Sequence, residues 1–123
     1  MLDVSFIILY VDKPEASAAF YADLLGCPAV ESSPTFAMFA MSSGTMLGLW
    51  SRHTVEPAAK AASASSEIAF TAAGKAEVDA MHADWNRRGL EIIQPPTELD
   101  FGRSFVALDP DGRRLRVFAP EGA

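Results

Sequence analysis

Hydrophobic and polar residues alternate along this chain with two periodicities, one of two residues and one of about 3.6 residues. The change from the strand period to the helix period and back occurs twice. Residues 2–11 form a β-branched and aromatic run that predicts a strand. From Pro14 onward, apolar residues recur at helical spacing until Gly26, which predicts a helix between them. We expect Asp12 to cap the first free amides of this helix and Gly26 to end it.

Three further strands and a connector complete the first half. The strands are predicted over residues 29–33, 35–41 and 46–51, and Gly44 lies in the turn that joins the last two. Residues 55–65 are rich in Ala, Ser and Pro and have no apolar period, so they predict a connector. Its alanines leave open a turn or two of helix.

The second half repeats this order. A shift of 61 positions places Ser5 on Ser66 and Ala22 on Ala83, and a self-similarity of this length indicates one module used twice. The predicted elements are a strand over 67–72, a helix over 74–88, a strand over 90–94 that gives way to a loop at Pro95 and Pro96, and a final hairpin of strands 103–108 and 115–120.

The two copies predict an α+β fold of two βαβββ modules within a single domain, residues 1–123. The modules are expected over 1–54 and 66–120, joined by the connector 55–65. Each curved mixed sheet would be covered by one helix on one of its faces. We expect the two free faces to form a cup, and this cup is the predicted site.

The composition argues against several classes of protein. The chain has a net charge of −6 and no run of basic residues longer than two, so a nucleic-acid partner is not expected. No apolar run approaches the roughly 20 residues that span a membrane. The one cysteine cannot form an intrachain disulfide. We therefore expect a soluble cytoplasmic protein with no membrane partner.

Several motifs resemble those of a known superfamily. Residues 6–26 and the segment LDPDGRRLRVF at 108–118 resemble the glyoxalase/bleomycin-resistance/extradiol-dioxygenase proteins, also called vicinal oxygen chelate proteins. Within it, GLWS at 48–51, SEIAF at 66–70 and the turn at 100–103 resemble the phenazine-antibiotic resistance proteins. The resemblance implies paired βαβββ modules and a homodimer with ligand cups at its interface, which binds a planar aromatic drug without transforming it.

The resemblance also implies where a divalent metal would be held. Enzymes of the superfamily use His or Glu/Gln on the first and the last strand of each module, donors that suit Fe, Mn, Ni or Zn. In this sequence those four places match Phe6, Gly48, Glu67 and Arg116. Only Glu67 could donate to a metal, and a guanidinium would repel the cation. We therefore expect no metal and no other cofactor.

Period-two alternation predicts which side chains share a face with these four positions. It places three residues of each strand toward the cup: Phe6, Ile8 and Tyr10; Met46, Gly48 and Trp50; Glu67, Ala69 and Thr71; Arg114, Arg116 and Phe118. The predicted ligand-binding residues are Trp50, Arg116, Glu67, Phe6, Gly48, Phe39, Phe101 and Tyr10.

Alternatives stay open for several of these residues. Phe6 and Phe39 could belong to the core, and Trp50 could pack at an interface between chains. Glu67 and Arg116 could pair with each other, as a buried acid and base usually must.

An aromatic cup with one acid and two bases fits a flat, aromatic, partly ionised ligand, because rings can stack on Trp50 and an arginine can take a carboxylate. The leading hypothesis is drug resistance by binding, in which the protein sequesters a planar aromatic antibiotic such as a phenazine without catalysis. One alternative is a metal-dependent or Glu67-based lyase, isomerase or dioxygenase of the same superfamily. Another is a small-molecule sensor or an accessory subunit.

Overall fold

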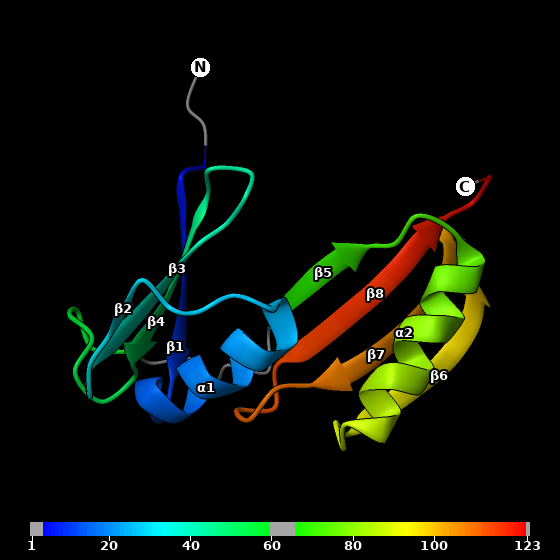
Figure 1. Ribbon diagram of the computed structural model, residues 1–123. Coiled ribbons are helices and arrows are strands. Elements are labelled where there is room, and N and C mark those ends of the chain that lie inside the picture. The colour runs from blue at the N-terminus through cyan, green and yellow to red at the C-terminus, as the bar shows by residue number, and fades with distance from the viewer. Residues whose placement is uncertain (1–3, 60–65, 123) are drawn as a thin grey trace. The chain divides into compact units, whose positions relative to one another are not determined.

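The computed structural model describes residues 4–59 and 66–122, which form two compact units on either side of residues 60–65 (Figure 1). Each unit contains one helix and one four-stranded mixed sheet. The predicted α+β fold of two βαβββ modules is confirmed. We call the units module 1 and module 2.

Module 1 consists of β1 (Phe6–Val11), α1 (Pro14–Leu25), β2 (Glu31–Ser32), β3 (Phe36–Ala40) and β4 (Met46–Ser51). Its sheet has the order β1-β4-β3-β2, in which β1 runs parallel to β4 and the other neighbours are antiparallel. The helix α1 packs on one face, mainly against β3 and β4. Val11, Phe39 and Leu49 are fully buried in this module, as is Tyr21 of α1.

Module 2 consists of β5 (Glu67–Thr71), α2 (Lys75–Arg87), β6 (Ile92–Leu99), β7 (Gly102–Leu108) and β8 (Arg114–Pro120). Its sheet has the order β5-β8-β7-β6, with β5 parallel to β8, so it repeats the topology of module 1. The helix α2 packs against β6, β7 and β8. Its Trp85 meets Phe70 and Phe105 edge to face, with ring centroids 6.0 and 5.2 Å apart, so the half-buried Phe70 packs beside the buried rings of Trp85 and Phe105.

The helix α1 starts and ends where the sequence predicts, but Asp12 does not cap it. Pro14 is its first residue and Gly26 ends it with a φ of 74°, a left-handed conformation that glycine adopts without strain. The N-cap residue is Lys13, and no described side chain bonds to the free amides. The Asp12 carboxylate is instead engaged by His53, whose Nε2 lies 2.6 Å from Oδ1. The predicted cap is wrong because a residue distant in sequence competes for the carboxylate.

The strand β6 is longer than the sequence predicts. The sequence predicts a strand over 90–94 and a loop from Pro95 and Pro96, but the strand spans Ile92–Leu99 and includes both prolines. Its pairing with β7 shifts register on either side of Gln94. Because β6 is an edge of the sheet, its outward N–H groups need no partner, and prolines can lie there without removing a ladder bond.

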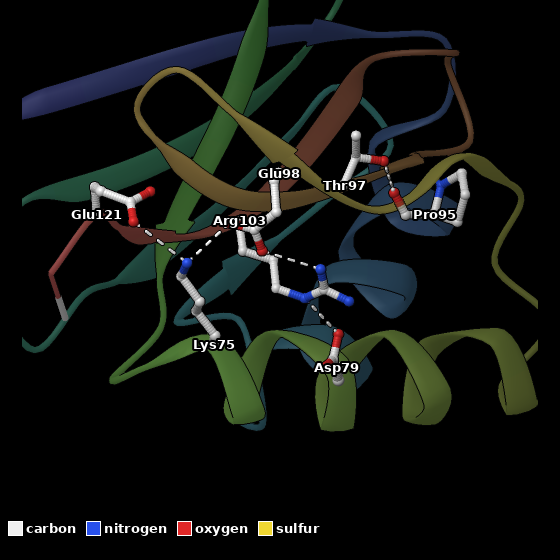
Figure 2. Close-up of polar contacts among 7 residues, drawn as sticks. All are labelled: Lys75, Asp79, Pro95, Thr97, Glu98, Arg103 and Glu121. Atoms are coloured by element: carbon white, nitrogen blue, oxygen red, sulfur yellow. Dashed lines mark hydrogen bonds and ion pairs between the residues drawn. The ribbon is translucent and has the colours of Figure 1, made fainter.

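Ion pairs tie the β6–β7 hairpin to α2 (Figure 2). Arg103 on β7 donates from Nε to Asp79 on α2 at 2.8 Å and from Nη1 to Glu98 on β6 at 3.1 Å. Lys75 at the start of α2 donates to the same Glu98 at 2.8 Å and to Glu121, which follows β8, at 3.4 Å. Hydrogen bonds lower the pKa of Glu98, and the bond from Lys75 has a larger effect than the bond from Arg103. Since these side chains are partly exposed to solvent, each pair is expected to stabilise the protein weakly.

The predicted connector lies only partly within the described residues. Residues 55–59 show no helix, and Val55 is buried among them. The rest of the connector, residues 60–65, lies outside the described residues. Part of the helical turns that the alanines left open would fall there. In the ranges that the structure describes, no helix is long and apolar enough to cross a membrane.

Candidate functional site

The open face of the module 1 sheet, opposite α1, carries exposed apolar side chains. On β1, Phe6, Ile8 and Tyr10 are 40%, 42% and 43% exposed, whereas Val11, on the other face, is fully buried. Ile7 also points to the α1 side and is nevertheless 48% exposed, because β1 is an edge strand and α1 lies over β3 and β4. The predicted alternation on β1 is confirmed, although burial on the helix side is incomplete.

Gly48 allows two rings to lie close to this open face. A Cβ at Gly48 would stand 2.7 Å from Cε1 of Phe6 and 3.0 Å from Cζ of Phe36, so a side chain there would displace both rings. Phe36 also meets Trp50 edge to face, with ring centroids 6.1 Å apart. Register places Tyr10 beside Trp50 on the neighbouring strand. We call Phe6, Tyr10, Phe36 and Trp50 the aromatic face.

The open face of the module 2 sheet is polar at its centre. Arg116 on β8 donates from Nε to Oε2 of Glu67 at 2.8 Å and from Nη2 to Oε1 at 3.4 Å. Its Nη1 donates to Oγ of the fully buried Ser104 at 2.9 Å. The alternative that Glu67 and Arg116 pair with each other is confirmed.

Arg116 keeps the Glu67 carboxylate charged. Its hydrogen bond is the largest cause of the lowered pKa of Glu67, which partial burial raises by a smaller amount. The positive charges of Arg116 and Arg114 lower this pKa further. Arg114 stands directly opposite Glu67 in the pairing of β5 with β8. A carboxylate held in the ionised form is a good ion-pair partner and a weak proton acceptor at neutral pH.

Phe101, at the turn of the β6–β7 hairpin, lies beside this ion pair. Its ring centroid is 5.8 Å from the guanidinium carbon of Arg116, a cation–π distance, and 5.9 Å from the ring of Phe118. Gly102 makes the turn possible, because its φ is 140° and a Cβ there would stand 2.0 Å from the carbonyl oxygen of Ala119. Phe101 remains 46% exposed, so part of its ring is available to a ligand.

An open pocket of about 240 Å³ lies on the same face of module 2. It is lined by three apolar and three polar side chains: Ile93, Leu99, Val106, Gln94, Arg114 and Arg116. We call it the arginine pocket. It can receive a small apolar group beside two guanidinium groups.

The structure removes one predicted residue from the site. Phe39 is fully buried on β3, where it pairs with Leu47 on the α1 side of the sheet. The open side of β3 carries Phe36 and Met38 instead. Phe39 belongs to the core of module 1, so its assignment as a ligand contact is wrong, because a side chain with no exposed surface cannot touch a ligand.

The other predicted residues fall into two groups. Phe6, Tyr10, Gly48 and Trp50 share the open face of module 1, and Glu67, Phe101 and Arg116 lie together in module 2. That these residues contact a ligand stays a prediction.

Three contributors to these faces are not predicted from the sequence. Phe36 could have been found, because it alternates with Met38 on a strand antiparallel to the strand of Trp50. Ser104 carries no signal in the sequence, since its role depends on a hydrogen bond across the sheet. The pocket wall at Leu99 is missed because the strand was expected to end before Pro95.

The four metal positions of the superfamily do not fit a metal in this chain. Two of them hold Phe6 and Gly48, which offer no donor side chain and lie against each other. At the other two, both carboxylate oxygens of Glu67 accept hydrogen bonds from Arg116. Among residues 4–59 and 66–122, no three His, Cys, Asp or Glu side chains are grouped so that they could hold a metal ion.

These features define a two-module α+β protein in which each sheet has one helix-covered face and one open face. The chain belongs to the Glyoxalase/Bleomycin resistance protein/Dioxygenase superfamily, whose model matches residues 4–117. The resemblance drawn from the motifs at both ends of the chain is thereby confirmed.

Particular relatives support this membership. The chain is 29% identical over 113 residues to the phenazine antibiotic resistance protein EhpR of Enterobacter agglomerans, covering 89% of this chain and 86% of the relative. A protein of Agrobacterium tumefaciens, solved by solution NMR, is 49% identical with a TM-score of 0.89, covering 99% of this chain and 100% of that one. A glyoxalase/bleomycin resistance protein/dioxygenase from Nocardioides is 27% identical with a TM-score of 0.82, covering 100% of this chain and 87% of that one.

Proposed function

We propose that this protein binds and sequesters a planar aromatic small molecule, an antibiotic of the phenazine kind, without a metal and without transforming it. The observation that carries the proposal is the aromatic face of module 1. Phe6 and Tyr10 are at least 40% exposed, and Phe36 and Trp50 are half-buried on the same open side of the sheet. Grouped exposed aromatic side chains are typical of binding surfaces.

Stacking on this face supplies part of the required affinity. Each well-placed ring pair contributes about 0.5–1.5 kcal/mol beyond the burial of area. Gly48 supports this face, because the absence of a side chain leaves room for the rings of Phe6 and Phe36 beside the strand. Protection by sequestration also requires more protein than drug and a Kd well below the drug concentration.

The relatives point in the same direction. EhpR of Enterobacter agglomerans is a phenazine antibiotic resistance protein, and this chain aligns with most of its length. A resistance protein that acts by binding needs an apolar, adaptable surface and no reactive group. We propose that the present chain acts in this way in the cytoplasm.

The enzymatic alternatives receive less support from the residues. Glu67 is the candidate general base, but its ion pair with Arg116 lowers its pKa and occupies both of its oxygens. A base poised for proton abstraction at neutral pH has a raised pKa instead. The donor set Phe6, Gly48, Glu67 and Arg116 likewise gives no support to metal-dependent chemistry.

We further propose that the protein is a homodimer. Its edge strand β1 exposes apolar side chains over its length: Val4 just before it, then Phe6, Ile7, Ile8 and Tyr10, all at least 40% exposed. An edge strand with this much apolar surface is typically covered by another sheet or chain. Sedimentation equilibrium should give twice the mass of the chain, and a monomer at every micromolar concentration would contradict this part of the proposal.

Equilibrium dialysis against phenazine, read by the absorbance of the ligand, tests the proposed function. We expect saturable binding that is unaffected by EDTA, and recovery of the ligand with unchanged mass. Trp50→Ala should weaken binding about tenfold through lost stacking and lost apolar contact. Val30→Ala, at a 60% exposed apolar position outside the strands, is the matched control and should leave Kd unchanged.

Two results would contradict the proposal. One is the absence of saturable binding for phenazine and for other planar aromatic compounds. The other is turnover of the ligand that a chelator abolishes, which would favour the enzymatic alternative.

A further inference from the structure

Two arginines line the arginine pocket, and they differ in what already engages them. Arg116 donates to Glu67 from Nε and Nη2 and to Ser104 from Nη1, so most of its donors are occupied. The side chain of Arg114 is exposed and makes no hydrogen bond or ion pair with another side chain within residues 4–59 and 66–122. Its guanidinium therefore has its donors available to a ligand.

The pocket carries an excess of positive charge. Within the part of the chain that the structure describes, Glu67 is the one acid that bonds to an arginine of this pocket, so Glu67, Arg114 and Arg116 together have a net charge of about +1 at neutral pH. Arg114 faces Glu67 across the strand pair, yet the carboxylate bonds to Arg116. This local excess lies in a chain whose net charge is −6, so it is not part of a general basic surface.

The rest of the lining is suited to an apolar body. Ile93, Leu99 and Val106 form apolar walls, and Phe101 lies against Arg116 at the edge of the face. A guanidinium binds a carboxylate through two parallel N–H···O bonds, in a geometry that lysine cannot reproduce. Aromatic rings can then lie on the apolar walls while the charged group reaches the arginine.

We propose that the arginine pocket is a subsite for the carboxylate of an aromatic acid, with Arg114 as the residue that recognises it. This inference rests on the proposed function, since it names the chemical class of the sequestered molecule. Arg116 lines the same pocket, and Glu67 and Ser104 hold its guanidinium in place. The subsite distinguishes an aromatic carboxylate from the neutral parent ring system.

A matched set of ligands tests this assignment. Equilibrium dialysis of the full chain would compare phenazine-1-carboxylate with phenazine-1-carboxamide, which has a similar shape without the charge, and with unsubstituted phenazine. The acid is expected to bind about tenfold more tightly than the amide, as a charge-assisted bond predicts. Raising the salt concentration should reduce this preference, because the arginine is exposed.

Variants assign the preference to one side chain. Arg114→Gln should abolish the preference for the acid over the amide, and Arg114→Lys should retain part of the preference. Arg87→Gln removes the same charge from an exposed position on α2 and should leave the preference intact. Circular dichroism would verify that each variant is folded.

The outcomes separate this inference from the proposed function. If the acid and the amide bind equally, or if Arg114→Gln keeps the preference, the carboxylate subsite is overturned while binding of aromatic ligands stands. If none of the three ligands binds, both ideas are overturned.

Discussion

Replacing Arg113 by methionine is expected to lower the free energy of unfolding by about 3–5 kcal/mol. The reason is a buried ion pair in the turn between β7 and β8. Nη1 of Arg113 donates to Oδ2 of Asp109 at 2.7 Å, and the side chains are 2% and 0% exposed. Nε of Arg113 also donates to Oγ of Ser66 at 3.3 Å.

The magnitude follows from what the substitution leaves behind. Methionine fills much of the volume of the side chain, so the main loss is the countercharge of a buried carboxylate. Asp109 still accepts hydrogen bonds from the backbone N–H groups of Asp111 at 2.9 Å and of residue 113 at 2.8 Å. This remaining solvation places the expected loss at the lower end, about 3 kcal/mol, which corresponds to a fall in Tm of about 10 °C for a chain of this size.

Urea unfolding followed by circular dichroism measures this loss. The matched control is Arg87→Met, which breaks another Arg–Asp pair, with Asp84, at a position where the arginine is 72% exposed. The control should change stability by less than about 1 kcal/mol. Replacing both partners, with Asp109→Asn and Arg113→Met together, should recover part of the loss, because no buried charge then lacks a partner.

Equal destabilisation by Arg113→Met and Arg87→Met would contradict a dominant role for the buried ion pair. A loss of unfolding free energy below about 1 kcal/mol for Arg113→Met would likewise contradict a strong contribution from the buried ion pair. If this variant does not fold, Arg113→Lys provides the measurement, since it keeps the charge and should lose less stability than methionine.

Two further predictions concern the fold around the open face of module 2. Gly102→Ala should destabilise the protein more than Gly44→Ala. Both glycines have a positive φ, a conformation that costs alanine about 1–3 kcal/mol. Of the two, only Gly102 would also bring a Cβ to 2.0 Å from the backbone carbonyl oxygen of Ala119. Equal urea midpoints for the two variants would contradict the clash. For Glu67, the folded-state pKa lies below the ordinary value of 4.5, so its ion pair stabilises the protein above that pH, and this stabilisation is lost as the pH falls through the lowered pKa. The urea midpoints of wild type and Glu67→Gln should therefore differ at pH 7 and converge below pH 4.5, and a constant difference across this range would argue against the pair.

Local patterns in the sequence predict most of the architecture. The internal repeat predicts two modules, because each copy carries the same change of period from strand to helix and back to strands. Alternation predicts the open side of β1, since side chains of a strand point to opposite faces in any sheet. The motif at 108–118 predicts the last hairpin, and Gly26 predicts the end of α1, because these signals depend on a few neighbouring residues.

The errors occur where a residue's role depends on its place in the sheet. Pro95 and Pro96 read as a loop, yet on the edge strand β6 they interrupt no pairing. Asp12 reads as a helix cap, but His53, a residue 41 positions away, competes for its carboxylate. Phe39 reads as a possible ligand contact, and the register with Leu47 turns it toward α1 instead.

The repeated module is encoded locally, because each copy carries its own succession of strand and helix periods. Which side chains act together depends on the tertiary structure. Glu67 and Arg116 are 49 positions apart and become a pair through the parallel alignment of β5 with β8. Gly48 admits the rings of Phe6 and Phe36 because three strands bring these residues side by side. Such contacts depend on strand order and register, which non-local pairing sets and local propensity does not.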